Sequence, residues 1–157
     1  VVSQREDGDE KTTLVDNAEN VESGYDEEEV CREIEDKLGV LPVRFGYRPD
    51  GLELSEYWIN ENAGEAIVKY AYKDSQLHIY ISKDYDASSI NYHMDDKKID
   101  TIFLPSAGIE LDVYRYSNNE NSYEVSFEYL NTYYSLTGMM DKEIFIQILE
   151  NIWIKNA

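Results

Sequence analysis

The stretch YEVSFEYLNTYYSLTG, residues 123–138, decides the fold class of this chain. In residues 123–129 every second residue is apolar or aromatic. Because the side chains of a strand alternate between two faces, this pattern predicts a strand with one face toward a core. Asn131-Thr132 interrupts the alternation and residues 133–137 resume it. The stretch therefore predicts an antiparallel hairpin closed by a short polar turn, with Gly138 stopping the second strand.

The residues that follow predict a helix over 141–154 that packs on this hairpin. Asp141 stands where its carboxylate can accept hydrogen bonds from the first helical turn, and Glu143 adds favourable charge there. Two neighbouring rows of apolar residues at helical spacing make a stripe broad enough to cover a sheet. The rows are Ile144, Ile148 and Ile152, and Phe145, Leu149 and Trp153.

Upstream, the pattern predicts a helix from Asp26 to Leu38 that is closed by Gly39, and then a turn at Pro49-Asp50-Gly51. A long loop is expected over residues 83–96. The remaining β-rich runs, separated by turn residues, are 52–60, 65–72, 76–82, 97–104 and 109–116. The whole predicts an α+β fold, an antiparallel sheet of roughly seven strands with a C-terminal helix packed on it and a short N-terminal helix.

Length and charge limit the partners. With 157 residues the chain is long enough for one domain. We expect residues 1–24, which are polar and acidic, to be a disordered linker, and residues 25–157 to be a single domain. The formal net charge of −19 disfavours nucleic acid and direct contact with anionic membranes, and it favours cationic partners.

Few residues offer catalytic or metal-binding chemistry. The single cysteine, Cys31, stands among acids that disfavour a thiolate. His78 and His93 fall in different predicted elements, which disfavours a zinc site or a histidine-based catalytic group. The carboxylates of Asp84, Asp86, Asp95 and Asp96 lack the spacing of a calcium loop. No nucleophile elbow or phosphate-binding glycine loop occurs. We therefore expect no catalytic residues, no metal and no cofactor.

Alternation does place polar and aromatic residues together on the face of the predicted sheet that is expected to face solvent. Tyrosine offers a flat apolar ring with a hydroxyl at its tip, so tyrosines among carboxylates suit a sugar or a cationic peptide. The same residues also fit ordinary cross-strand pairs. The candidate ligand-binding residues are His78, Tyr80, Tyr114, Tyr116, Glu124 and Glu128.

Two short motifs resemble a family of domains of unknown function that is common in Gram-positive bacteria. The first is Tyr134-x-Leu136-x-Gly138 followed by Asp141-x-Glu143-Ile144, and the second is Leu41-Pro42 followed by Tyr47-Arg48-Pro49-Asp50-Gly51. The similarity covers about residues 38–154. It implies an extracytoplasmic domain behind a membrane span, in proteins related to anti-sigma factors. It implies no catalytic residues, and the polar segment 83–96 departs from it.

Three functions are compatible with these observations. The first is a non-catalytic extracytoplasmic sensing or binding domain for a protein, peptide or cell-wall ligand, tethered by a membrane anchor upstream of Val1. The second is a soluble acidic inhibitor or toxin-neutralising protein that occupies a basic active site. The third is a hydrolase with a carboxylate pair, for which 33 acidic residues always supply candidates.

Overall fold

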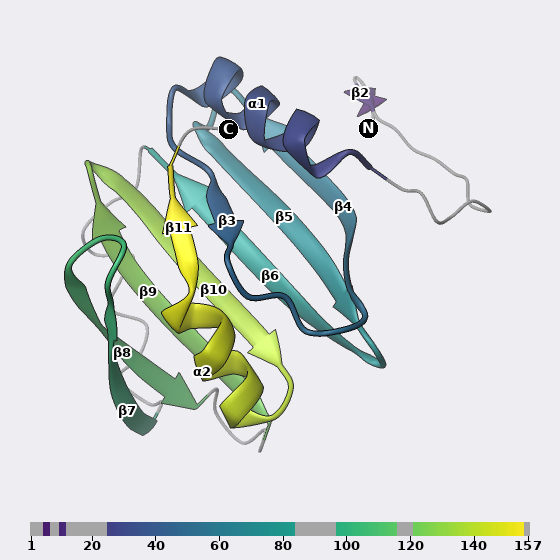
Figure 1. The fold of residues 1–157 in the computed structure, drawn as a ribbon. Coiled ribbons are helices and arrows are strands. Elements are labelled where there is room, and N and C mark those ends of the chain that lie inside the picture. The colour runs from purple at the N-terminus through teal and green to yellow at the C-terminus, as the bar shows by residue number, and fades with distance from the viewer. Residues whose placement is uncertain (1–4, 7–9, 12–24, 84–96, 116–120, 156–157) are drawn as a thin grey trace.

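A computed structural model of the chain describes residues 5–6, 10–11, 25–83, 97–115 and 121–155. Its centre is a seven-stranded antiparallel sheet in the order β4-β5-β6-β10-β9-β8-β7 (Figure 1). The α+β prediction is therefore confirmed. The strands are β4 (Leu52–Asn60), β5 (Glu65–Tyr72), β6 (Ser75–Ser82), β7 (Lys97–Leu104), β8 (Ile109–Arg115), β9 (Ser122–Tyr129) and β10 (Thr132–Met139).

The other elements are two helices and two short pairs of strands. The helices are α1 (Glu27–Leu38) and α2 (Lys142–Glu150). The first pair joins β3 (Val43–Phe45) to β11 (Ile152–Ile154), and the second joins β1 (Arg5–Glu6) to β2 (Glu10–Lys11). The domain boundary expected near residue 24 stays a prediction, and most of the predicted loop 83–96 lies outside the described residues.

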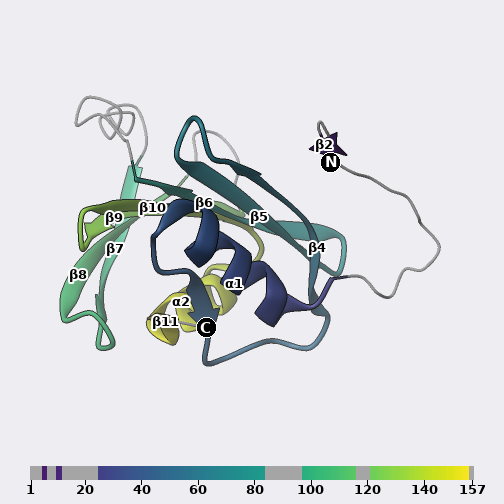
Figure 2. The same ribbon diagram turned by 90° about the horizontal axis from the view of Figure 1, so that it is seen from above.

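Both helices and the β3-β11 pair lie on one face of the sheet, here called the inner face (Figures 1 and 2). The opposite face is called the outer face, and no described helix or strand packs on it. The core lies between the inner face and the helices. Its most buried side chains include Ile34, Leu77, Ile79, Leu111, Leu136, Phe145, Ile148 and Leu149. Burying these apolar groups is the main term that stabilises the fold.

Helix α1 forms as its sequence predicts. The Asp26 carboxylate accepts a hydrogen bond from the backbone N–H of Glu28 at 3.0 Å. Gly39 ends the helix with φ 70°, and its N–H donates to the carbonyl of Glu35. Val30, Ile34 and Leu38 are buried, as one apolar stripe requires.

Gly138 does not stop its strand, because β10 continues to Met139. Its role is a close approach of two elements. A Cβ atom at this position would lie 2.6 Å from Cδ1 of Phe145 on α2. The absence of a side chain therefore lets α2 pack directly on the middle of the sheet.

The turn between β9 and β10 is displaced by one residue from the prediction. Leu130 and Asn131 form it, with φ values of 52° and 62°. Thr132 already pairs with Tyr129 in the ladder. Two successive residues with positive φ match a turn whose twist suits a two-residue hairpin, and leucine is an unusual residue for that conformation.

The predicted helix 141–154 is too long at its C-terminal end. Asp141 does occupy the N-cap position, although its side chain makes no capping hydrogen bond. Helix α2 ends at Glu150, and Ile152–Ile154 then form β11 against β3. Trp153 consequently leaves the apolar stripe and is 47% exposed. Isoleucine and tryptophan favour a strand as readily as a helix, and pairing with β3 decides between them.

Candidate functional site

The strand register brings five of the six predicted ligand-binding residues onto the outer face. His78 pairs with Thr137, Thr137 pairs with Glu124, and Glu124 pairs with Tyr114, so these side chains share one row across the sheet. Tyr80 pairs with Ser135 in the next row. Glu128 lies in a third row, opposite Tyr133. Tyr116 lies outside the described residues.

The middle of this face is more buried than the sequence suggests. Glu124 was expected to face solvent, but it is only 9% exposed. Its carboxylate accepts hydrogen bonds from the hydroxyls of Ser135 at 3.2 Å and Ser126 at 3.4 Å. Tyr133, opposite Glu128, is likewise buried. A buried carboxylate requires such donors, so Glu124 is part of the sheet's internal hydrogen bonding rather than an accessible acid.

Besides an exposed strip on β7 and β8 that includes Phe103, the accessible part of the outer face lies on β4, β5 and β6. We call it the outer-face patch and define it by Trp58, Glu65, Ile67, Lys69, His78 and Tyr80. Cross-strand pairs hold it together, because Ile67 lies between Trp58 and Tyr80, and Lys69 lies opposite His78. Only His78 and Tyr80 of this set were identified from the sequence.

Hydrogen bonds fix the tyrosines at the border of the patch. The Tyr80 hydroxyl donates to Oε1 of Glu65 at 2.7 Å. The Tyr80 and Tyr133 rings meet edge to face, with centroids 6.0 Å apart, and the Tyr133 hydroxyl donates to Oγ of Ser126 at 3.1 Å. Burial and the hydrogen bond to Glu65 raise the pKa of Tyr80, so its hydroxyl remains protonated near neutral pH.

His78 is shifted toward its neutral form. Partial burial lowers its pKa from the usual 6.5, and the Lys69 ammonium opposite it acts in the same direction. Glu56 opposes this effect but is a smaller influence. At neutral pH the imidazole is therefore uncharged, and it can both donate and accept hydrogen bonds.

Trp58 is the most exposed aromatic residue of the patch, with 43% of its surface accessible. The Lys69 ammonium lies 4.6 Å from the centre of its ring, in a cation–π arrangement. Simple alternation along β4 would place Trp58 with Leu52 and Leu54 on the inner face. A bulge between Leu54 and Glu56 reverses the alternation, so Tyr57 faces the helices and Trp58 faces outward.

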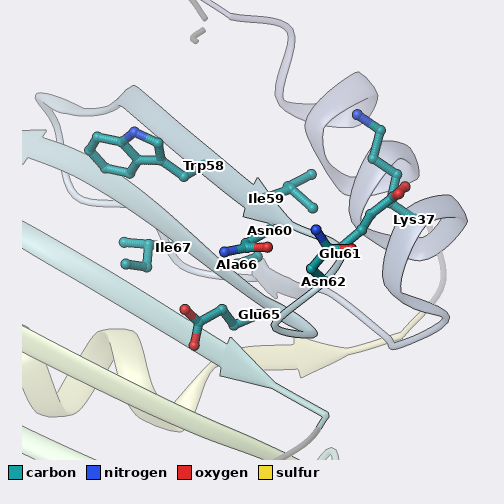
Figure 3. A pocket seen from close by; sticks show the side chains of 9 residues that line it. All are labelled: Lys37, Trp58, Ile59, Asn60, Glu61, Asn62, Glu65, Ala66 and Ile67. Carbon is teal, nitrogen blue, oxygen red and sulfur yellow. The ribbon is translucent and has the colours of Figure 1, made fainter. Parts of the chain in front are cut away.

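A pocket of about 780 Å³ lies at this end of the patch, around the tip of the β4–β5 hairpin (Figure 3). Figure 3 shows Trp58, Ile67 and Glu65 along the two strands, and Lys37 on α1 with its amino group directed away from the hairpin tip. The volume is that of a small-molecule site, and the pocket is open to solvent rather than enclosed. The remaining lining residues are Ile59, Asn60, Glu61, Asn62 and Ala66.

A second polar cluster joins α1 to the inner face. Glu27 accepts hydrogen bonds from Arg48 and from the Tyr70 hydroxyl, each at 2.6 Å. Glu28 pairs with Arg44, and Glu33 accepts from the Tyr57 hydroxyl at 2.6 Å. Tyr70 is 2% exposed, and burial followed by the Glu27 charge raises its pKa far above the usual value. These contacts fix the position of α1 on the sheet.

Cys31 lies beside this cluster and is buried. Burial raises the pKa of its thiol from 9.0 to about 11. Arg44 opposes the shift, whereas Glu27 and Glu28 add to it. The thiol therefore stays protonated, as the surrounding acids suggested, although burial is the larger cause.

Metal and membrane signals are absent from the part of the chain that the structure describes. There, no three His, Cys, Asp or Glu side chains are grouped closely enough to hold a metal ion. His93 and the acids at 84, 86, 95 and 96 lie outside that part. None of the described helices has the length and apolar character needed to cross a bilayer.

Comparison with known proteins identifies a family. No curated protein and no solved structure matches the chain. A family model, described as a domain of unknown function (DUF4367), matches residues 42–152, which contain every strand of the seven-stranded sheet and α2. Helix α1 precedes the matched region. The chain belongs to the DUF4367 family.

Proposed function

We propose that this chain is a non-catalytic, extracytoplasmic binding domain that recognises its ligand through the outer-face patch. The observation that carries the proposal is the patch itself. An exposed indole, a tyrosine fixed by a carboxylate and a neutral imidazole lie together on a sheet face that no described element covers. Exposed aromatic residues beside polar groups are typical of binding surfaces.

The scaffold supports this role because it holds the patch rigidly. Each residue of the patch lies on a paired strand. The hydrogen bond from the Tyr80 hydroxyl to Oε1 of Glu65, 2.7 Å long, orients the Tyr80 side chain. Groups that are already held in place lose little conformational entropy on binding. The inner face is occupied by the core and the helices, so the accessible polar groups of the sheet are those of the outer face.

The proposed location is outside the membrane of a Gram-positive cell, behind an anchor that precedes Val1. The motif resemblance and the acidic stretch at residues 1–24 support it. Two experiments on the full-length gene product in its own cells test the location: membrane fractionation, and then protease treatment of intact, wall-stripped cells. Sedimentation with membranes and digestion from outside are expected. A soluble and protected domain would refute the location.

Binding is tested with isolated Gram-positive cell walls and the purified domain. We expect the walls to retain the wild-type domain and to lose most of the double variant His78→Ala/Tyr80→Ala. The matched control is Trp153→Ala, because Trp153 is 47% exposed but lies on β11, over the inner face. Equal retention of all three proteins would contradict the assignment of the patch.

The acidic inhibitor and the carboxylate-pair hydrolase stay predictions. An inhibitor of a basic active site would form a complex that weakens steeply with salt, because screening reduces its charge attraction. Wall binding through aromatic rings and hydroxyls would change little with salt. Retention at low and high ionic strength therefore separates the two binding functions.

A further inference from the structure

We propose that the pocket at the tip of the β4–β5 hairpin is a saccharide-binding site, with Trp58 as the ring on which a sugar stacks. This inference rests on the proposed function and names the ligand class of the same patch. The pocket combines three elements of structure, since β4, β5 and the C-terminal turn of α1 all contribute side chains (Figure 3).

The first argument is the geometry of the aromatic residue. Trp58 is 43% exposed, and its strand is paired along the full β4–β5 ladder. The Lys69 ammonium lies over one face of the indole, 4.6 Å from the ring centre, and restrains it, so a sugar would stack on the other face. A flat apolar surface of this kind complements the C–H face of a pyranose.

The second argument is the set of hydrogen-bonding groups around the ring. Oδ1 of Asn60 accepts from the N–H of Ala63 at 3.1 Å, which leaves the Asn60 amino group as a donor toward the pocket. Oε1 of Glu65 accepts from Tyr80, which leaves Oε2 as an acceptor. Glu61 and Asn62 add a carboxylate and an amide. Donors and acceptors that line the same pocket as an aromatic ring match the paired donor and acceptor character of sugar hydroxyls.

The third argument is charge, which favours a neutral ligand. Lys37 pairs with Glu33 at 2.6 Å, and Lys69 pairs with Glu56 at 3.7 Å. An anionic ligand would meet the carboxylates of Glu61 and Glu65, whereas the lining residue Lys37 is already paired with Glu33. A neutral, hydroxyl-rich molecule avoids this repulsion.

The test uses the purified protein and a printed array of bacterial, plant and animal glycans. Isothermal titration calorimetry then follows with soluble hexamers of β-1,4-linked N-acetylglucosamine, β-1,4-linked glucose and α-1,4-linked glucose. We expect at least one glycan to bind. We also expect Trp58→Ala to weaken that binding by about tenfold or more, the loss of roughly one stacked ring, and Trp58→Tyr to retain part of it.

Trp153→Ala is the matched control, because Trp153 is 47% exposed, close to the 43% of Trp58, and the Lys155 ammonium lies 5.1 Å from its ring centre. It should bind like the wild type. The inference is overturned if no glycan binds, or if Trp58→Ala binds as tightly as the wild type. Suppose that cell walls retain the domain and that retention requires Tyr80, but that no glycan binds and Trp58→Ala does not change wall retention. The proposed function then stands, and the saccharide inference fails. If glycans bind through Trp58 while His78→Ala/Tyr80→Ala leaves wall retention unchanged, the saccharide inference stands, and the assignment of His78 and Tyr80 to the binding surface fails instead.

Discussion

Gly138 on β10 and Phe145 on α2 are in direct contact, because a Cβ at position 138 would lie 2.6 Å from Cδ1 and 2.8 Å from Cε1 of the ring. We predict that Gly138→Ala lowers the free energy of unfolding by about 1–3 kcal/mol, since the buried ring cannot move away without disturbing the core. Denaturant unfolding measures this loss. In a Phe145→Leu background, which leaves more space, the same substitution should cost clearly less. Equal costs in both backgrounds would show that the contact is not the cause.

Glu27 should contribute more to stability than its neighbours on α1. Glu27→Ala removes the acceptor of Arg48 and of the buried Tyr70 hydroxyl, so we expect a loss of about 1–3 kcal/mol. Glu29 lies in the same first turn and, among the residues that the structure describes, forms an ion pair with the exposed Arg32 at 3.5 Å. Glu29→Ala should therefore change stability by less than about 0.5 kcal/mol. Similar losses for both variants would contradict the specific role of Glu27.

Cys31 should react slowly with thiol reagents in the folded protein. Its pKa rises from 9.0 to about 11, which reduces the thiolate fraction near neutral pH by about 100-fold, and burial slows the reaction further. Timed alkylation of native and urea-unfolded protein measures the ratio. Rates within about tenfold of each other would mean that the thiol is accessible, contrary to the structure.

His78 should make the fold less stable in mild acid. Its pKa is lowered in the folded state, so the unfolded chain binds the proton more readily and stability falls as pH drops through about 6.5. Denaturant unfolding between about pH 7.5 and about pH 5.5, above most carboxylate titration, follows this change. His78→Gln should show a smaller loss than the wild type, whereas an unchanged loss would assign the effect to other groups.

Local pattern predicted most of this fold because most strands follow simple alternation. Strands β5, β6 and β7 begin and end within one residue of the expected positions, and α1 has the caps that its sequence indicates. In β5 and β6 the buried face is apolar along the whole strand, and turn residues mark the ends of all three strands. Such elements need no information from distant parts of the chain.

The errors occur where distant contacts decide. The local pattern predicts that Gly138 ends its strand, because it does not show that Phe145 packs against Gly138. It predicts helix over Ile152–Ile154, because it does not show that β3 pairs with this segment. Trp58 was missed because a single bulge after Leu54 reverses the faces of β4. Glu124 was assigned to solvent because alternation gives the face of a residue but not its burial.

Photocrosslinking in living cells tests most directly whether the outer-face patch is the binding surface. The residue p-benzoylphenylalanine would replace Trp58, Tyr80 or Trp153, one at a time, in the full-length gene product. All three positions carry aromatic rings, but Trp153 lies over the inner face. The proposal predicts adducts with another cell component from positions 58 and 80 and none from position 153. Adducts from position 153 alone would place the binding surface on the opposite side of the domain and contradict the proposal.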